Sequence, residues 1–479
     1  MKVIQIPFCF APDPVGGTEI YVANLARDLQ KIGVNAIIAA PGATTTSYNL
    51  DGLEVRRYAV GEVADVSELY GAGDQLAAKE FAKILDDESP DIVHLHAFTA
   101  GVSLRIVRTA KARGIPVAFT YHTPTVTCQR GTLLRWGKQI CDGEIRVVRC
   151  AGCSLNSLGM PAPIAAAVGM LPPAIGKQIG RLGLHGGAWT ALRSSQLTSM
   201  RRDTFEAMIG EVDQVIAVCN WVQDLLTRNG VPAKKLSLSR QGINFDPNSS
   251  TLRITDPEIT RIAFFGRLDP TKGVHVVLAA LASLPRAKIR FDIYGVSQGS
   301  TNYLEELRRT AGNDARVTFH GPLAHDEVIA RLRHYDFLAI PSQWMETGPL
   351  VALEAFAAGV PVIGWDMGGV RELVRHDVDG LLIGPTDTWT RVLKLISEDN
   401  GLRARLKAGV RPPKPSAAVA DEMFALYRAL VGAVAVANLP LVPPNDENRS
   451  TKPSGPDADG TGGLRFNRRM SGLDPKAPF

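Results

Sequence analysis

The chain has 479 residues, of which 45% are hydrophobic and 21% charged, so it is long enough for two globular domains with separate cores. Its formal net charge of +5 is too small to indicate nucleic-acid binding, but it is compatible with an anionic ligand or an anionic membrane surface. The most apolar stretch, 164–175, is interrupted by Gly169, Pro172 and Pro173, which argues against a transmembrane helix.

The first predicted strand is 2–6. It contains one lysine and is followed by the polar segment DPVGG with no small-residue cleavage site, so it is not typical of a signal peptide, and we expect a cytoplasmic protein. Further apolar, β-branched runs are separated by amphipathic stretches such as 21–33. The predicted strands of this first half that follow are 34–40, 91–96, 116–122 and 214–218.

The second half repeats this alternation of strands and helices. Amphipathic stretches such as 303–311 and 325–335 lie between the apolar runs. The predicted strands are 261–266, 289–295, 316–321, 337–341, 361–365 and 380–384. Strands that alternate with helices are typical of parallel sheets, so we predict an α/β fold with two Rossmann-like domains.

Composition predicts how the domains are divided along the chain. Ser416 is a candidate N-cap of a closing helix, in which Met423, Leu426, Leu430 and Val434 share one face. Beyond residue 438 no periodicity remains, which favours a disordered tail. The predicted parts are an N-terminal domain (1–245, with a cysteine-containing insertion at about 123–205), a linker (246–258), a C-terminal domain (259–400), a closing segment (401–437) and the tail (438–479).

A glycine-rich junction follows the first strand. Gly16 and Gly17 allow the backbone to approach a phosphate or sugar closely, and Thr18 is a candidate N-cap of the next helix. Any tight strand-to-helix turn could use the same glycine pair, so this loop alone does not identify a site.

A basic loop, GRLDPTKG, follows the first strand of the second domain. Open α/β sheets bind ligands at the carboxyl ends of their strands, where Arg267 and Lys272 are expected. An arginine fork and a lysine suit a departing nucleoside diphosphate. The alternative is a pair of solvated cations on a loop.

A third loop carries two glutamates, Glu346 and Glu354, on either side of Pro349. Proline suits a first helical turn, so Glu354 is expected a little over one turn inside the helix, where it could accept hydrogen bonds from ribose hydroxyls. Glu346 is expected to face the sugar. The backbone N–H groups predicted to open toward an anion are those of Gly348, Leu350 and Val351.

Together the motifs GGTE, GRLDPTKG and ETGPLVALEAFAAGVPVIGWDMGGVRELV resemble the group-1, family-4 retaining glycosyltransferases of GT-B fold, over residues 1 to about 435. The resemblance implies two facing Rossmann-like domains, a sugar-nucleotide donor and no cofactor in catalysis. It also implies front-face transfer, in which the leaving phosphate helps to deprotonate the acceptor hydroxyl. The implied donor-binding positions are Gly17, Arg267, Lys272, Glu346 and Glu354, and Gly368, Gly369 and Glu372 resemble the next loop of the family.

The same family places a histidine at the end of an N-terminal strand against the reacting sugar. His122 ends the predicted strand 116–122 and is the candidate. His94 and His96 compete for this description, and a buried structural histidine is the alternative for each of them.

Four cysteines cluster within the predicted insertion and end in a Cys-x2-Cys pair. Four thiolates suit tetrahedral zinc, and in a reducing compartment this outranks disulfides. The wide spacing of the first pair departs from a zinc ribbon, so an iron–sulfur cluster and plain buried thiols stay as alternatives. The candidate ligands are Cys128, Cys141, Cys150 and Cys153.

A segment without acidic residues, 154–202, carries Lys177, Arg181, Arg193, Arg201 and Arg202. It predicts either a solvated insertion or a basic surface that docks on anionic lipid or on a lipid-linked acceptor, with the protein at the inner face of the membrane.

The leading hypothesis from the sequence is transfer of a hexose-type unit, with retention, to a glycan or lipid-linked acceptor in polysaccharide or glycoconjugate biosynthesis. Rivals are an epimerase or glycogen-type synthase of the same fold and a non-catalytic sugar-nucleotide- or metal-binding regulatory protein. Intact Arg267, Lys272, Glu346 and Glu354 argue against a decayed site.

Overall fold

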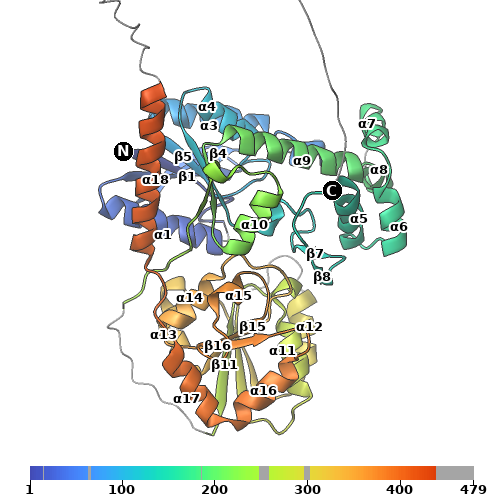
Figure 1. The fold of residues 1–479 in the computed structure, drawn as a ribbon, viewed down its shortest axis with the longest axis vertical. Helices are drawn as coiled ribbons and strands as arrows, with labels where there is room; N and C mark the ends of the chain where they lie inside the picture. Colours follow the sequence, from blue (N-terminus) through green and yellow to red (C-terminus); the bar gives the residue numbers. More distant parts are fainter. Residues whose placement is uncertain (14–15, 63–65, 185, 247–257, 296–301, 438–479) are drawn as a thin grey trace, which may run out of the picture. The chain divides into compact units, whose positions relative to one another are not determined.

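The computed structural model describes residues 1–13, 16–62, 66–184, 186–246, 258–295 and 302–437 (Figure 1). Most of the predicted linker (247–257) and the predicted tail (438–479) therefore lie outside the described residues. Within the described part of the chain, no helix is both long enough and apolar enough to cross a membrane.

The first half forms an eight-stranded sheet in the order β10-β9-β6-β5-β1-β2-β4-β3, in which only β3 runs antiparallel to its neighbour. Helices α1 (Gly17–Lys31), α3 (Gln75–Glu88), α4 (Leu104–Lys111), α9 (Ser194–Glu211) and α10 (Asn220–Arg228) accompany it, with the short α2 (Val66–Tyr70) and η2 (Ala233–Lys235). The strands are β1 (Lys2–Ile6), β2 (Asn35–Gly42), β3 (Thr46–Leu50), β4 (Leu53–Ala59), β5 (Ile92–Leu95), β6 (Val117–Tyr121), β9 (Gln214–Ala217) and β10 (Leu236–Leu238).

All five strands predicted in this half are confirmed, because β1, β2, β5, β6 and β9 are buried on both faces and their sequences are continuously apolar. Three strands toward the sheet edges, β3, β4 and β10, escaped prediction. β4 mixes buried side chains with partly or fully exposed ones, and β3 and β10 are partly or fully exposed, so their sequences lack the apolar run.

The second half forms a six-stranded parallel sheet in the order β13-β12-β11-β14-β15-β16. Its strands are β11 (Thr260–Phe265), β12 (Ile289–Tyr294), β13 (Val317–His320), β14 (Phe337–Ile340), β15 (Val362–Trp365) and β16 (Gly380–Ile383), and all six were predicted. Strand order reverses between β11 and β14, so the loops after these two strands border the crevice where such sheets bind nucleotides.

Helices cover both faces of this second sheet (Figure 1). They are α11 (Val274–Ala282), α12 (Asn302–Ala311), α13 (Val328–Leu332), α14 (Leu350–Ala357), α15 (Gly368–Leu373), α16 (Trp389–Glu398) and α17 (Asn400–Gly409), with the 3-10 turns η3 (Pro270–Lys272) and η4 (His325–Glu327). The core lies in two layers, one with Phe291 and Trp389 and the other with Ala352 and Phe356.

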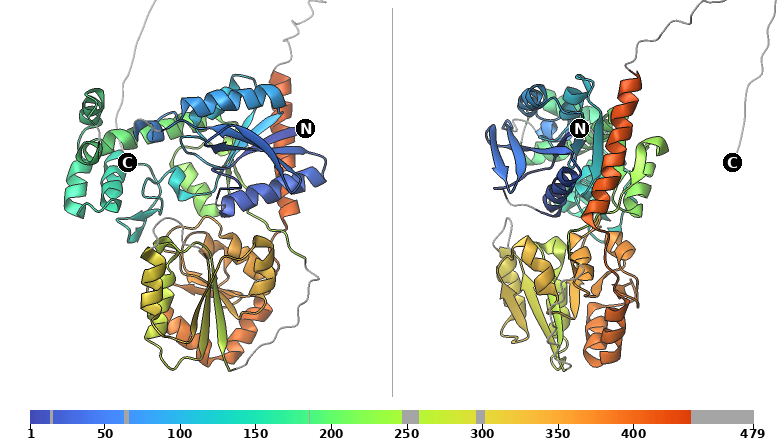
Figure 2. Two further views of the ribbon diagram at one scale, coloured as in Figure 1. Left: turned by 180° about the vertical axis from the view of Figure 1, so that it is seen from behind. Right: turned by 90° about the vertical axis from the view of Figure 1, so that its left-hand side faces the viewer.

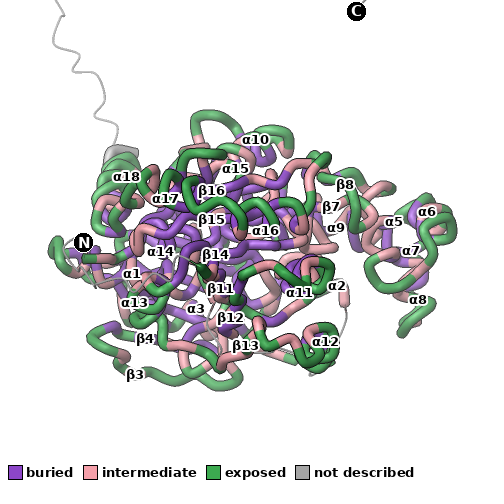
Figure 3. Tube along the Cα trace, turned by 90° about the horizontal axis from the view of Figure 1, so that it is seen from below, coloured by how far each residue is buried: buried purple, intermediate pink, exposed green. Residues whose placement is uncertain are grey.

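The predicted insertion forms a small helical extension of the first half (Figure 2). It comprises η1 (Pro124–Val126), the hairpin β7 (Leu134–Arg135) and β8 (Gln139–Ile140), and the helices α5 (Val147–Ser157), α6 (Ala162–Gly169), α7 (Pro173–Arg181) and α8 (Gly187–Leu192). Much of α6, α7 and α8 is exposed, in contrast to the strands of the second sheet (Figure 3).

The prediction of a basic surface on this segment is wrong for two of its five cations. Arg201 is 8% exposed, and its Nη2 donates to the carbonyl of Phe98 at 3.0 Å while its guanidinium lies over the Phe98 ring. Arg193 is 2% exposed. Backbone carbonyls and an aromatic face satisfy Arg201 inside the protein, so a count of charges along the sequence overstates the surface charge.

The predicted closing helix is confirmed as α18 (Ser416–Ala437), which packs against α1 of the first half. Its fully buried residues are Val419, Ala420, Met423 and Tyr427, so the predicted apolar face is rotated toward Tyr427. Ser416 is the first helical residue, and its hydroxyl bonds to the side chains of Asp28 and Asn244.

Candidate functional site

The loop after β11 places Lys272 at the switch point of the second sheet. Asp269 caps η3 by accepting from the N–H of Thr271 at 2.8 Å. Gly273 follows at a φ of 72°, and a Cβ there would lie 2.0 Å from the carbonyl oxygen of Pro341. Only glycine permits this approach, which brings Lys272 against the loop that follows β14.

Glu346 is the centre of a compact hydrogen-bonded cluster in that second loop. Its Oε1 accepts from Lys272 Nζ at 2.7 Å, from Ser342 Oγ at 2.7 Å and from Trp344 Nε1 at 2.6 Å. The residue is 7% exposed. A buried carboxylate is tolerated when a cation and further donors satisfy it, so this cluster holds Glu346 in one orientation.

The loops after β14 and β15 pack backbone against backbone. The N–H of Gly369 donates to the carbonyl of Glu346 at 2.5 Å. Gly368 has a φ of 56°, and a Cβ added to it would lie only 2.8 Å from the same carbonyl oxygen. The contact fixes the main chain from Glu346 to Gly348 in front of α14. Pro349 is the N-cap of α14, not a residue of its first turn as predicted, and the helix begins with Leu350 and Val351.

Glu354 lies in the second turn of α14 and is 5% exposed. Burial raises its pKa to about 7. Its Oε1 is 3.2 Å from Nδ1 of His325 in η4, and burial lowers the pKa of that histidine, which favours a hydrogen bond from a neutral imidazole over an ion pair.

The glycine pair after β1 begins α1. Gly16, and not Thr18 as predicted, is the N-cap, and Glu19 Oε2 accepts from its N–H at 2.8 Å. A Cβ on Gly17 would lie 3.8 Å from Leu350 Cδ1, so this loop lies beside the start of α14. Burial raises the pKa of Glu19, and the nearby positive charge of Arg267 opposes that rise.

His122 lies at the end of β6, next to the Glu346 loop. Its carbonyl accepts from Thr347 Oγ1 at 2.5 Å, and Trp221 Nε1 of α10 donates to the carbonyl of Glu346 at 3.1 Å. His122 is 4% exposed, and burial lowers its pKa to about 3, so its imidazole is neutral at physiological pH. His94 and His96, the competing candidates, are buried behind it.

Two clusters therefore form from the predicted residues. In one, Lys272 bonds to Glu346, and Thr347 beside it bonds to the backbone of His122. In the other, Gly17 lies beside Leu350, and Arg267 is close enough to Glu19 to oppose the rise of its pKa. A small cleft near the first cluster is lined in part by Gln241, Thr347, Gly348 and Gly369.

Glu372, from the motif that resembles the next family loop, contacts the start of α10 in the first half. Its carboxylate accepts from the N–H groups of Asn220 at 2.9 Å and Trp221 at 2.8 Å, and Arg240 Nη2 lies 3.0 Å away. It thus caps α10 of the first half, where a negative charge is favourable at a helix N-terminus.

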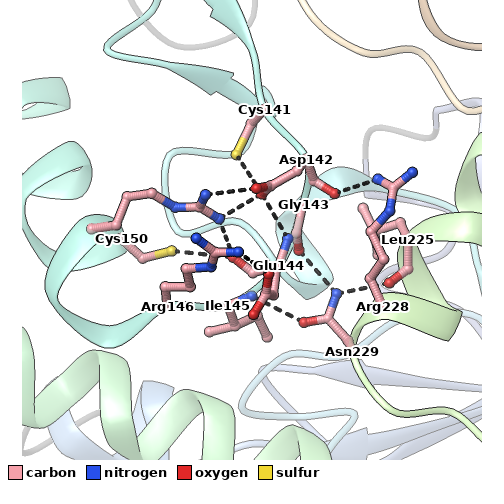
Figure 4. Close-up of polar contacts among 11 residues, drawn as sticks. Cys141, Asp142, Gly143, Glu144, Ile145, Arg146, Cys150, Leu225, Arg228 and Asn229 are labelled. Carbon is pink, nitrogen blue, oxygen red and sulfur yellow. Dashed lines mark hydrogen bonds and ion pairs between the residues drawn. The ribbon is translucent and has the colours of Figure 1, made fainter. Parts of the chain in front are cut away.

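The four clustered cysteines are free thiols. The thiol of Cys141 donates a hydrogen bond to Asp142 Oδ1, with 3.7 Å between Sγ and Oδ1 (Figure 4). The thiol of Cys150 donates to the carbonyl oxygen of Glu144, with 3.8 Å between the two atoms. Burial raises the pKa of Cys150 to about 11 and also raises the pKa of Cys128 and Cys141. Among the residues that the structure describes, no three His, Cys, Asp or Glu side chains are grouped so that they could hold a metal ion. The sequence-based zinc site stays a prediction.

Several residues of the site were not predicted from the sequence. Ser342 and Trp344 lie four and two positions before Glu346, and a search for donors beside the glutamate would have found them. Thr347 directly follows Glu346, whereas Gln5 and Tyr427 reach the site only through the fold, so no local spacing marks these two.

Two Rossmann-like sheets, the second with charged loops at its switch point, define a two-domain α/β protein. The family model "Glycosyl transferases group 1" matches residues 254–411 and "Glycosyl transferase 4-like domain" matches residues 16–239. The chain belongs to the group 1 glycosyl transferases, and its fold is GT-B.

Solved structures with this fold include the sucrose-phosphate synthase of Thermosynechococcus elongatus, at a TM-score of 0.62 and 18% identity over 90% of this chain and 99% of that one. HepE of Anabaena, in complex with UDP-glucose, has a TM-score of 0.54 and 16% identity over 91% and 99%. At these identities the likeness shows the fold alone.

Curated relatives include the D-inositol 3-phosphate glycosyltransferase of Rhodococcus jostii, 31% identical over 221 residues, which are 42% of this chain and 49% of the relative. That of Xylanimonas cellulosilytica is 32% identical over 230 residues, 43% of this chain and 54% of the relative. The chain thus spans about half the length of the curated relatives it matches.

Proposed function

We propose that this protein is a retaining glycosyltransferase that transfers a sugar from a nucleoside-diphosphate sugar to a hydroxyl of a glycan or lipid-linked acceptor. The observation that carries the proposal is the pair of Lys272 and Glu346, 2.7 Å apart, at the switch point of the second sheet. Open α/β sheets bind nucleotides at this point, and a bare structural ion pair would not require the glycine approach at Gly273.

The donor's charged part is assigned to the loops after β11 and β14. Lys272 and Arg267 face the diphosphate, and the first N–H groups of α14, from Leu350 and Val351, add the positive end of a helix dipole. Gly17, which lies beside Leu350, is assigned to the diphosphate from the first half. These groups stabilise the charge that develops as the nucleoside diphosphate departs, so the chemistry requires no metal cofactor.

The donor's uncharged parts are assigned to the glutamates. Glu354 accepts hydrogen bonds from the ribose hydroxyls once its carboxyl is ionised. Glu346 orients the sugar through Oε2, because Lys272, Ser342 and Trp344 already occupy Oε1. His122 contacts the sugar from the other domain.

Transfer with retention then follows a front-face path. The bond from the anomeric carbon to the phosphate oxygen breaks, and the acceptor oxygen bonds to the same face of the sugar. The departing phosphate oxygen takes the proton of the acceptor hydroxyl, so no protein nucleophile is needed.

A donor panel tests the proposal. Thermal shift with nucleoside diphosphates and their sugars should single out one base, because binding to the native state raises Tm. Turnover assays then offer the stabilising donor with glycan, lipid-linked and inositol phosphate acceptors, the last because the curated relatives carry that name. Product anomers analysed by NMR must keep the donor configuration. Donor binding with no transfer to any acceptor would favour the regulatory alternative, and sugar inversion without an acceptor would favour an epimerase.

Peripheral contact with an anionic membrane is part of this proposal. The insertion exposes Leu158 at 81%, Met170 at 63% and Leu182 at 73%, and Lys177 and Arg181 are also exposed there. Apolar side chains beside cations suit the interface of an anionic bilayer.

Co-sedimentation with vesicles of anionic lipid tests this contact. Leu182→Glu should reduce the bound fraction, whereas Leu395→Glu, at an exposed leucine of α16, should not. Equal binding of both variants, or of neutral vesicles, would contradict the assignment.

A further inference from the structure

A continuous chain of buried polar side chains links α18 to His122. Gln5, His94, His96 and Tyr427 are at most 2% exposed, and neither Gln5 nor Tyr427 has a part in the family resemblance. Nε2 of Gln5 donates to the hydroxyl of Tyr427 at 3.1 Å, and Oε1 of Gln5 lies 2.7 Å from His96 Nε2. His96 Nδ1 in turn lies 3.0 Å from His122 Nε2.

With the Gln5 amide oriented so that Nε2 faces Tyr427 and Oε1 faces His96, the donor and acceptor roles along this chain follow one from another. The Gln5 carbonyl oxygen only accepts, so His96 must carry its proton on Nε2. Its Nδ1 is then a lone pair, which requires a proton on Nε2 of His122. The Nδ1 of His122 is therefore an unprotonated acceptor.

Tyr427 is the partner of the Gln5 amide nitrogen, so it is the group at which the direction of the chain begins. Its hydroxyl oxygen accepts from Gln5 Nε2, which leaves the hydroxyl proton for His94 Nδ1, 2.6 Å away. His94 Nε2 then donates to Thr120 Oγ1 at 2.7 Å, so this branch is also satisfied. If the Gln5 amide were reversed, every bond would reverse and His122 would carry its proton on Nδ1.

His122 Nδ1 is buried, and among the described residues it has no hydrogen-bond partner. An unpaired buried polar atom costs stability unless a ligand satisfies it. The backbone of the same residue contacts the Glu346 loop through Thr347, so the residue that carries this atom borders the region assigned to the sugar.

We propose that Tyr427 is a positioning residue which, through Gln5 and His96, holds His122 in the Nε2–H tautomer, so that Nδ1 accepts a hydrogen bond from a hydroxyl of the donor sugar. The sugar contact rests on the proposed function. The tautomer does not, because it follows from side chains within the protein.

NMR of the full chain labelled with ¹⁵N-histidine tests the tautomer without any substrate, because ring nitrogens with and without a proton have separate ¹⁵N shifts. His122→Gln assigns the signals. We expect an unprotonated Nδ1 and a protonated Nε2 in the wild type, and a protonated Nδ1 would overturn the proposal.

Tyr427→Phe should mix the two tautomers of His122 and lower kcat on the order of 10-fold, with little change in KM for the donor, as for the loss of other groups that orient a ligand through a neighbour. Tyr58→Phe is the matched control, since Tyr58 is also fully buried and loses one bond, to the carbonyl of Gly101. It should change neither the histidine spectrum nor kcat.

Gln5→Met interrupts the same chain at a second point. The double variant should be no slower than Tyr427→Phe alone, because both changes remove one relay. Additive losses, or a wild-type tautomer that survives in Tyr427→Phe, would assign Tyr427 a merely structural role.

Adding the donor separates the two parts of the inference. A shift of the His122 Nδ1 signal on binding supports the sugar contact. The predicted tautomer with no response to any sugar nucleotide would leave the relay in place and contradict the donor assignment.

Discussion

The two halves of the candidate site differ in the charge of their polar side chains. The loops of the second sheet carry formal charges, with Lys272 bonded to Glu346 and Arg267 exposed. At the first sheet His122 and the groups behind it are neutral and buried. A charged, partly hydrated surface suits a diphosphate, whereas neutral groups of fixed direction suit uncharged hydroxyls. In the proposed function, the charged loops therefore bind the donor's leaving group, and the neutral groups of fixed direction bind its sugar.

Glu346→Gln should have the largest effect. The amide keeps the size of the side chain but loses the charge that pairs with Lys272, so kcat should fall on the order of 100-fold to 1,000-fold, as when one preorganised group is lost from an active site. Steady-state assays with the donor from the panel measure this. Asp366→Asn, at an exposed ion pair with Arg371, is the control. A kcat within about threefold of the wild type would remove Glu346 from the reaction.

Lys272→Ala should mainly weaken donor binding. Loss of a charge-assisted contact to phosphate costs about 1.5–3 kcal/mol, which is roughly 10-fold to 150-fold in Kd. Calorimetry with the nucleoside diphosphate measures it, and the nucleoside alone should bind equally well to both proteins. Lys288→Ala, an exposed lysine of the same half, is the control. Equal losses for nucleoside and nucleoside diphosphate would indicate a local unfolding effect instead.

Glu354 predicts a pH dependence of donor affinity. Burial raises its pKa from 4.5 to about 7, and the ribose hydroxyls need the ionised form, so affinity should rise with pH and level off above about 7. Glu354→Gln should remove this dependence and weaken binding by a few fold.

The same shift has the opposite sign for folding. Between pH 4.5 and about 7 the unfolded chain binds fewer protons than the native one, so the stability contributed by protonated Glu354 falls as pH rises. Denaturant unfolding of wild type and Glu354→Gln across this window measures it. A dependence that persists unchanged in the variant would belong to another group.

The smallest expected effect concerns metal. If the thiols of Cys141 and Cys150 keep these separate oxygen partners in solution, a chelator should leave Tm unchanged within about 2 °C. Elemental analysis of the same sample accompanies the measurement. Release of one zinc with a large fall in Tm would instead establish the metal site that the cysteine spacing predicts.

The sequence predicted the charged half of the site better than the neutral half. Strands buried on both faces leave continuous apolar runs, and the charged loops after them, with Lys272 and Glu346, stand out locally. The relay to His122 joins Gln5 to Tyr427, which are 422 positions apart, so the sequence around either residue gives no sign of it. The prediction that Arg201 lies on the surface was wrong because the sequence shows the charge of this side chain but not the backbone carbonyls to which it donates.

The last helix, α18, packs on a different half of the protein from the one it follows in the sequence. By sequence α18 follows the second sheet, yet its side chains complete the core around Tyr21 and Val22 of α1. The chain passes from the first half to the second after Ile243 and returns to the first half at Pro415. These two residues form a parallel β-bridge, so the two connections run side by side. A fragment ending at residue 245 would therefore expose an apolar face. Supplying 416–437 as a separate peptide should restore that fragment, and exchanging donor domains between relatives would require two cut points.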